Sequence, residues 1–321
     1  MITELKFKRI LFATDFLQSS RLALDYAVAF ARHFEATIIM LHVVELSDAG
    51  IEAELTTLRP CMTRLDAEER LETFASSVRE TRVNIETYVK DGFPSDGILL
   101  AATTHQADMI VLGVQGVHRG IGHFLVGSNT ERILLSAPCP TLTVGPHTLA
   151  GVGLVLHPKE ILYFSDFTPE AAAAAPYALF LGRAYQVPVD VCQLIPEIAE
   201  GNPNLRRKLA DEYCEMMRRV IPESHSDWCF PAFHLDHGMA IDEIVKRAQT
   251  QLAALIVLGV RKQSQLSRRL HTSFAYQLLA KASCPVLTIP DASVCGAELV
   301  RSLEGMMDFS LGSNAGSIQS A

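Results

Sequence analysis

The chain repeats itself, and this repeat limits what it can fold into more than any other feature of its sequence. Residues 8–16 return at residues 159–167, an offset of 151. Residues 110–114 return 146 positions later, and the Cys-Pro pair at Cys139 returns 145 positions later at Cys284. The matching segments keep their order, so the sequence indicates two copies of one domain. A length of 321 residues agrees with two domains.

The boundaries of the two copies follow from the repeat. We expect the first domain at residues 1–146, a Gly- and Pro-containing linker at 147–158 and the second domain at 159–290. The remaining residues, 291–321, form a tail rich in Ser, Gly and Ala, which we expect to be partly disordered.

Each copy reads as alternating strands and helices. Short apolar runs rich in Ile, Val and Leu predict buried strands, and segments with a 3.6-residue apolar period predict helices. In the first copy the expected strands are 9–13, 36–44, 84–89, 109–113 and 141–144, and the expected helices are 19–34, 65–80, 95–104 and 128–135. We expect Ser95 to cap the third helix. The second copy repeats this plan with strands near 161, 187–195, 233–235, 255–259 and 286–289.

Strands separated by helices predict the fold class. They favour an α/β fold in which each copy is a five-stranded parallel sheet with helices on both faces. In such a sheet, ligands bind beyond the carboxyl ends of the strands, where the strand order reverses. Asp15 and Gly113 each end one of the expected strands, so both are candidates for that edge.

A glycine-rich segment follows the fourth strand of the first copy. Its glycines include Gly113, Gly116 and Gly127, and we interpret residues 117–126 as a loop. Ser128 and Asn129 follow Gly127 at the start of a helix, where free backbone N–H groups and the helix dipole favour an anion. The composition therefore supports phosphate binding, with a plain flexible connection as the alternative. His118 and His123 lie in this segment; we favour exposed residues without a role, and the alternative is that they contact phosphate when protonated.

Charge and cysteine content exclude several classes of protein. The formal net charge of −8 disfavours broad nucleic-acid binding but not the binding of ATP by backbone N–H groups. Seven cysteines, an odd number without a C-x-x-C spacing, argue against a disulfide framework and a zinc knuckle. His234 and Asp236 lack an evident third ligand, so no metal site is expected. No apolar run reaches transmembrane length and no export signal begins the sequence, so we expect a cytoplasmic location without membrane contact.

These motifs together resemble those of a tandem universal stress protein. The resemblance covers about residues 5–145 and 157–290 and rests on the strand ending in Asp15, the glycine-rich segment and the Cys-Pro approach to the last strand. It implies two Rossmann-like domains of the adenine nucleotide alpha hydrolase-like type. It also implies ATP as the cofactor, with Mg²⁺ as an optional companion.

The resemblance also assigns roles to single residues. It implies that Ala13 and Asp15 face the nucleotide and that Val43 contacts adenine. It implies that ribose and phosphates are held by Gly113, Gly116, Gly127, Ser128 and Asn129. One departure concerns spacing, because ten residues separate Gly116 from Gly127 where the family pattern has nine. A second reading of Asp15 is that its carboxylate only caps the following helix.

The second copy departs further from the family pattern. Lys262 stands in place of Gly116, and Thr272-Ser273 stands in place of Gly127-Ser128. A Cβ at these positions restricts a close approach of the backbone, which favours a degenerate copy without ligand. The alternative is that the basic side chains replace the backbone contacts and still bind an anion; these are Arg261, Lys262, Arg268 and Arg269.

Two functions remain open. The first is an adenine-nucleotide-binding regulatory protein of the stress response with its pocket in the first domain. The second is an interaction protein without nucleotide, in which the two domains form a pseudo-dimer. An enzyme is disfavoured, because neither a G-x-G-x-x-G after the first strand nor a G-x-x-x-x-G-K-S/T is present, and weak ATP hydrolysis with Mg²⁺ on Asp15 is the most that the residues suggest. The family resemblance implies that the last strands of the two domains meet edge to edge; a further homodimer is open.

Overall fold

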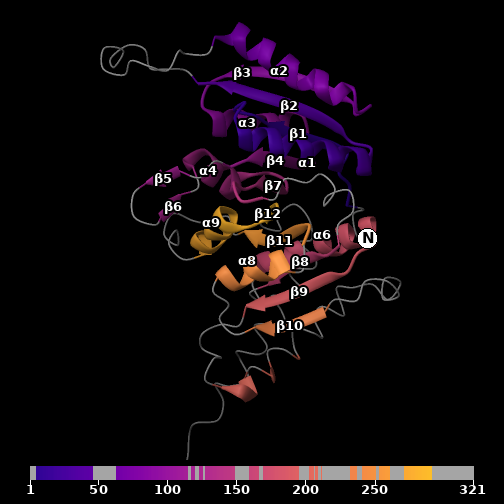
Figure 1. Cartoon of the computed structure of the whole chain (residues 1–321), viewed down its shortest axis with the longest axis vertical. Helices are drawn as coiled ribbons and strands as arrows, with labels where there is room; N and C mark the ends of the chain where they lie inside the picture. Colours follow the sequence, from indigo (N-terminus) through magenta and orange to yellow (C-terminus); the bar gives the residue numbers. More distant parts are fainter. Residues whose placement is uncertain are drawn as a thin grey trace, which may run out of the picture.

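The structure is a computed structural model of the whole chain, shown in Figure 1. It describes residues 5–45, 63–114, 117–119, 123–125, 127–148, 159–165, 169–194, 202–205, 207–208, 211, 232–236, 241–250, 253–260 and 271–290. The predicted tail at 291–321 and most of the predicted linker lie outside these residues.

The described elements alternate between strands and helices, as expected. The first copy contains β1 (Arg9–Ala13), α1 (Gln18–Phe34), β2 (Thr37–Val44), α2 (Arg64–Arg79), β3 (Ile85–Asp91), α3 (Pro94–Thr104), β4 (Met109–Gly113), β5 (Val117–Arg119), β6 (His123–Leu125), α4 (Ser128–Ser136) and β7 (Thr141–Val144). The second contains β8 (Ile161–Ser165), α6 (Pro169–Tyr185), β9 (Val189–Leu194), β10 (Ala232–Asp236), α8 (Ile241–Thr250), β11 (Leu255–Val260), α9 (His271–Lys281) and β12 (Val286–Pro290).

One sheet of ten strands runs through both copies. Its order is β10-β9-β8-β11-β12-β7-β4-β1-β2-β3, so each copy contributes five neighbouring strands. Pairing within each copy is parallel, which confirms the predicted fold class. The copies join through β12 and β7, which pair in antiparallel fashion in the middle of the sheet (Figure 1).

The register at this seam has two-fold symmetry. Leu142 pairs with Leu287, its equivalent at the repeat offset of 145, and the neighbouring pairs are Thr143 with Val286 and Thr141 with Thr288. The Thr288 hydroxyl donates to the Thr141 carbonyl oxygen at 3.1 Å. The seam is therefore an isologous two-fold interface formed inside a single chain.

The helices cover the two faces of the sheet differently. On one face, α1, α2 and α6 share a single apolar core that crosses the seam, including an aromatic contact between Phe34 and Phe180 with ring centroids 5.6 Å apart. On the opposite face the core is divided into a cluster under α3 and α4 and a cluster under α8 and α9. Leu134 of α4 belongs to the second of these clusters, so α4 also packs against the second copy.

A buried ion pair distinguishes the second copy from the first. Asp190 of β9 is fully buried and accepts hydrogen bonds from Arg247 of α8 at 2.7 and 3.0 Å. The repeat places Ile39 at the equivalent position in the first copy, where it is buried in an apolar cluster. The second copy thus has a charged contact between sheet and helix where the first has an apolar one.

Two local expectations are wrong. Ser95 does not cap α3, because the helix begins one residue earlier, with Phe93 as N-cap and Pro94 in the first turn, and Ser95 is buried inside it. Residues 117–126 are not simply a loop, because Val117–Arg119 and His123–Leu125 pair as an antiparallel hairpin whose second strand lies against α9. Three-residue strands are too short for an apolar period to reveal them.

Among the described residues, no helix combines the length and the apolar character that crossing a membrane requires.

Candidate functional site

The candidate site lies at the carboxyl ends of the central strands of the first copy. The chain moves from β1 to β2 and β3 on one side and returns to β4 and β7 on the other, so the strand order reverses between β1 and β4. Ala13 ends β1 and Gly113 ends β4, which puts both beside this reversal. Such a point is where open α/β sheets bind ligands.

Gly113 lies against the first turn of α1. A Cβ built on it would come within 2.4 Å of the Ser19 carbonyl carbon and oxygen and within 2.6 Å of the Ser20 nitrogen. These are backbone atoms of a helix and cannot turn aside as a side chain can. Gly113 is therefore required by the packing of α1 on β4, whether or not a ligand also contacts it.

Asp15 is exposed and organises the turn between β1 and α1. Its Oδ1 accepts hydrogen bonds from the Leu17 backbone N–H at 3.0 Å and from the Ser20 hydroxyl at 2.5 Å. The alternative reading of Asp15 as a helix cap is wrong, because Leu17 is the N-cap of α1 and no side chain caps the helix; the contacts of Asp15 instead hold the turn before it. Because the side chain is exposed, they leave it accessible to a ligand.

Ala13 and Val43 lie together in the apolar cluster under α3 and α4. Val43 is 8% exposed, and a Cβ on Gly97 of α3 would come within 2.8 Å of its Cγ2. The side chain predicted to contact adenine is thus buried against α3, and Gly97 is what allows the helix to approach it. The sequence reasoning missed Gly97, although a glycine inside a helical segment is itself a signal of close packing.

His42 is a buried polar residue beside this turn. It is 8% exposed and its Nδ1 lies 2.7 Å from the carbonyl oxygen of Thr14. Its ring lies 4.4 Å from that of Phe16, measured between centroids. Burial lowers the pKa of His42, and nearby Arg70 adds to this, while the Thr14 carbonyl and Asp15 oppose it. The sequence shows His42 only as a lone His in an apolar strand, and this pattern alone did not predict its contact with the turn.

Gly127, Ser128 and Asn129 form the start of α4, at the same edge of the sheet as the end of β4. Gly127 is the N-cap, with φ −60° and ψ 149°, and no side chain caps the helix. Among the described residues outside its own chain neighbours and helix backbone, no atom lies within 4 Å of a Cβ placed on Gly127. The position is thus open, and the first backbone N–H groups of the helix lie next to it without a capping side chain. Ser128 and Asn129 are exposed.

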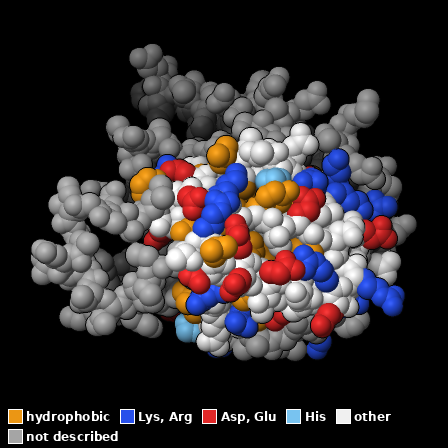
Figure 2. Space-filling view, turned by 90° about the horizontal axis from the view of Figure 1, so that it is seen from above, with side chains coloured by type: hydrophobic (Ala, Val, Ile, Leu, Met, Phe, Trp, Pro, Cys, Tyr) orange, Lys and Arg blue, Asp and Glu red, His pale blue; other side chains and the backbone are white. Residues whose placement is uncertain are grey.

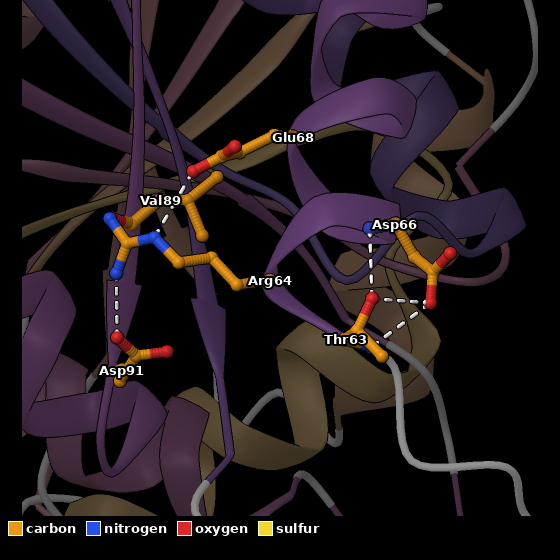
Figure 3. A network of polar contacts seen from close by, with 6 residues as sticks. All are labelled: Thr63, Arg64, Asp66, Glu68, Val89 and Asp91. Atoms are coloured by element: carbon orange, nitrogen blue, oxygen red, sulfur yellow. Dashed lines mark hydrogen bonds and ion pairs between the residues drawn. The ribbon is translucent and has the colours of Figure 1, made fainter.

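An ion-pair network lies at the carboxyl end of β3, the outermost strand of the first copy (Figure 3). Arg64, at the start of α2, contacts the Asp91 carboxylate at 2.6 Å, the Glu68 carboxylate at 3.1 Å and the Val89 carbonyl oxygen at 3.1 Å. Thr63 and Asp66 form a capping box on the same helix. The network joins α2 to the edge strand β3 at the carboxyl end of the sheet. Figure 2, which views the molecule from above the α2 and β3 side of Figure 1, shows basic and acidic side chains intermingled there rather than gathered by sign.

Some of the predicted site residues lie close together in the structure, and others are not among the described residues. Asp15 and Gly113 both contact the Ser19–Ser20 turn of α1, and Ala13 and Val43 share one cluster. Outside the described residues lie Gly116, Arg261, Lys262, Arg268 and Arg269. Thr272 and Ser273 fall inside α9, which begins at His271, so Thr272 is not an N-cap as Gly127 is. Among the described side chains, no group of three or more His, Cys, Asp or Glu could hold a metal.

Comparison with known proteins matches both copies to the same protein family. The family model described as the universal stress protein family matches residues 6–145 and again residues 158–290. A universal stress protein of Methanocaldococcus jannaschii is 31% identical over 140 residues, which cover 43% of this chain and 82% of the relative. Another, from Thermus aquaticus, is 31% identical over 144 residues, covering 43% of this chain and 98% of the relative.

A solved structure resembles the whole arrangement. The crystal structure of a universal stress protein from Archaeoglobus fulgidus aligns with a TM-score of 0.66 at 19% identity, over 88% of this chain and 98% of the other. A protein of unknown function from Pseudomonas aeruginosa aligns with a TM-score of 0.59 at 16% identity, over 94% of this chain and 98% of the other. At these identities the likeness concerns the fold, which includes both copies.

Proposed function

The chain belongs to the universal stress protein family, and from that premise we propose that it is a regulatory protein of the stress response that binds ATP or another adenine nucleotide in its first copy. One observation carries the proposal. Gly127 opens α4 at the carboxyl edge of the sheet with free space where a Cβ would stand and with no capping side chain. This is the local geometry that phosphate oxygens require at a helix N-terminus.

The residues present fit such a ligand. Phosphates would meet the backbone N–H groups after Gly127 and the exposed side chains of Ser128 and Asn129. The sugar and base would lie over the end of β1, beside the small exposed parts of the nearly buried side chains of Ala13 and Val43. The net charge of −8 is no obstacle, because backbone N–H groups and the helix dipole carry no net charge.

Asp15 would complete the pocket on the side of β1. Its carboxylate is exposed and accepts hydrogen bonds from Leu17 and Ser20, so its position is fixed before any ligand arrives. A carboxylate in this place suits a ribose hydroxyl, or a Mg²⁺ ion that accompanies the phosphates. If Mg²⁺ is involved, replacing Asp15 by Asn should weaken ATP binding in the presence of Mg²⁺ more than in its absence.

Gly127 provides a sharp test, because a change there leaves the fold intact. We would titrate ATP with Mg²⁺ into the full chain by calorimetry and compare Gly127→Ala with Gly127→Phe. The small side chain should leave binding within a few fold of the original, and the large one should abolish it by filling the open position. Circular dichroism and melting temperature serve as the control that both variants are folded. Equal binding by Gly127→Phe would move the pocket elsewhere.

The second candidate function is an interaction protein without nucleotide. It is favoured by the fact that Gly113, Asp15 and Val43 each have a packing or hydrogen-bonding reason within the fold itself. Denaturing protein purified from a cell extract should release adenine nucleotide if the pocket is used. If none is released and millimolar ATP with Mg²⁺ leaves the melting temperature unchanged, the nucleotide-binding function is refuted and the interaction protein is the remaining candidate.

A further inference from the structure

Phe16 has a backbone conformation that aromatic residues rarely adopt. Its φ is 64°, in the left-handed region, at the point where the chain leaves β1 for α1. A conformation of this kind persists only when its surroundings determine it, and such outliers gather at functional sites. Phe16 directly follows Asp15, so whatever holds Phe16 also sets the direction of the Asp15 carboxylate.

The contacts that hold this turn come largely from β2. His42 donates its Nδ1–H to the Thr14 carbonyl oxygen at 2.7 Å, which assigns the proton of the neutral ring to Nδ1. The imidazole also lies 4.4 Å from the Phe16 ring, and Phe16 contacts Phe74 of α2 at 5.5 Å between ring centroids. The Thr14 hydroxyl oxygen accepts the Phe16 backbone N–H at 2.9 Å. Among the side chains that the structure describes, His42 is the one that contacts the turn through both a hydrogen bond and its ring.

The position of His42 on β2 explains why it contacts the turn from the face of the sheet opposite to α3 and α4. Neighbouring residues of a strand point to opposite faces of the sheet. Val43 lies in the cluster under α3 and α4, whereas His42 contacts Phe16, which packs on the core of the α1 and α2 face. His42 therefore touches the turn without standing where a ligand would.

We propose that His42 is a positioning residue of the nucleotide pocket, which holds the Thr14–Phe16 turn so that the Asp15 carboxylate is presented to the ligand. This inference rests on the proposed function. His42 acts through Thr14 and Phe16 and does not itself contact ATP. Its donor sets the Thr14 carbonyl, and its ring supports the left-handed Phe16.

Two variants separate the donor from the ring. His42→Asn keeps an N–H donor at the same number of bonds from the backbone and loses the ring, whereas His42→Phe keeps a ring and loses the donor. His105→Phe is the matched control, because His105 also lies 4.4 Å from an aromatic ring, that of Tyr88, but follows α3 at the opposite edge of the sheet. Each variant of the full chain would be measured for its ATP affinity, its melting temperature and its amide exchange.

The expected pattern differs from that of a merely structural residue. His42→Phe should bind ATP about tenfold more weakly, because the Thr14 carbonyl loses its donor, whereas His42→Asn, which loses only the ring support of Phe16, should bind about threefold more weakly despite a lower melting temperature. In the protein without ligand, the Leu17 amide should exchange faster in His42→Phe, because its acceptor on Asp15 is less well fixed. His105→Phe should leave ATP affinity and Leu17 exchange unchanged.

The outcomes distinguish this inference from the function on which it rests. If the original chain fails to bind ATP, the proposed function is wrong, and with it the assignment of His42 to a nucleotide pocket. If the original chain binds and His42→Phe binds equally well, the function stands and the positioning role is refuted. The role is also refuted if affinity simply follows melting temperature across the three variants.

Discussion

Gly113 and Gly127 were assigned the same role by sequence, yet the structure gives them opposite responses to one added carbon. In Gly113→Ala the new Cβ would stand 2.4 Å from the Ser19 carbonyl, where ordinary contacts begin near 3.4 Å, so strand and helix must separate by about 1 Å. Overpacking of this kind costs about 1–3 kcal/mol, and backbone on the opposing side favours the upper end of that range. The reduced freedom of the unfolded chain returns about 0.4–1 kcal/mol. We therefore expect a net loss of about 2 kcal/mol.

Gly127→Ala is the matched control for this expectation. Its φ of −60° is open to any residue and its Cβ has no neighbour within 4 Å. The gain from the unfolded chain and the slightly poorer N-cap nearly cancel, so stability should change by less than about 0.5 kcal/mol.

The measurement is urea unfolding of the full chain followed by circular dichroism, with the slope of the transition compared among the three proteins. Equal stability of Gly113→Ala and the original chain would refute the packing argument. So would a loss in Gly127→Ala as large as that in Gly113→Ala, because it would show that the space at Gly127 is filled.

Three further predictions follow from other parts of the fold. Arg247→Met should destabilise the chain by about 3–5 kcal/mol, because it removes the ion pair between Arg247 and the buried Asp190 carboxylate. The double variant Arg247→Met with Asp190→Leu should regain most of this stability. Urea unfolding measures both, and a loss under about 1 kcal/mol for the single variant would contradict the argument. Cys139 and Cys284 should stay unmodified when the folded protein is treated with iodoacetamide at pH 8, because burial raises the pKa of each thiol to about 12; mass spectrometry of the peptides checks this, and rapid labelling of either would disprove its burial. Burial lowers the pKa values of His33, His42 and His105, so the unfolded chain binds protons first as the pH falls. The free energy of unfolding should therefore decline below about pH 6.5. The decline should be smaller in His42→Phe, and an unchanged pH dependence in that variant would count against the buried imidazole.

Much of the fold could be predicted from local sequence, because buried parallel strands form continuous apolar runs. The strands at 9–13, 109–113 and 141–144 agree with β1, β4 and β7 to the residue. The start of α3 differs from the expected cap at Ser95 because Pro94 occupies the first turn of the helix, and the hairpin of β5 and β6 leaves no sequence pattern because its strands are only three residues long.

The candidate site was less readable from sequence, because its residues serve more than one purpose. Asp15 at a strand end could be recognised from its place in the pattern, but its bonds to Leu17 and Ser20 depend on the turn that follows. The reason for Gly113 lies in α1, which packs on it from more than 90 residues away in the chain. The role of His42 depends on a left-handed Phe16, and no pattern in the sequence signals that conformation at an aromatic residue.

The two-fold seam through Leu142 and Leu287 has a consequence for how the copies can change. When two identical chains meet in this way, every substitution appears on both sides, and dilution can separate the partners. Here the partner is tethered by the chain itself, so its effective concentration stays constant however little protein is present. Each half is also free to accept substitutions that the other does not share. The first half has Ile39 and Gly116 where the second has Asp190, paired with its arginine, and Lys262. Joining the halves in one polypeptide therefore lets the two sides of a symmetric seam differ in sequence.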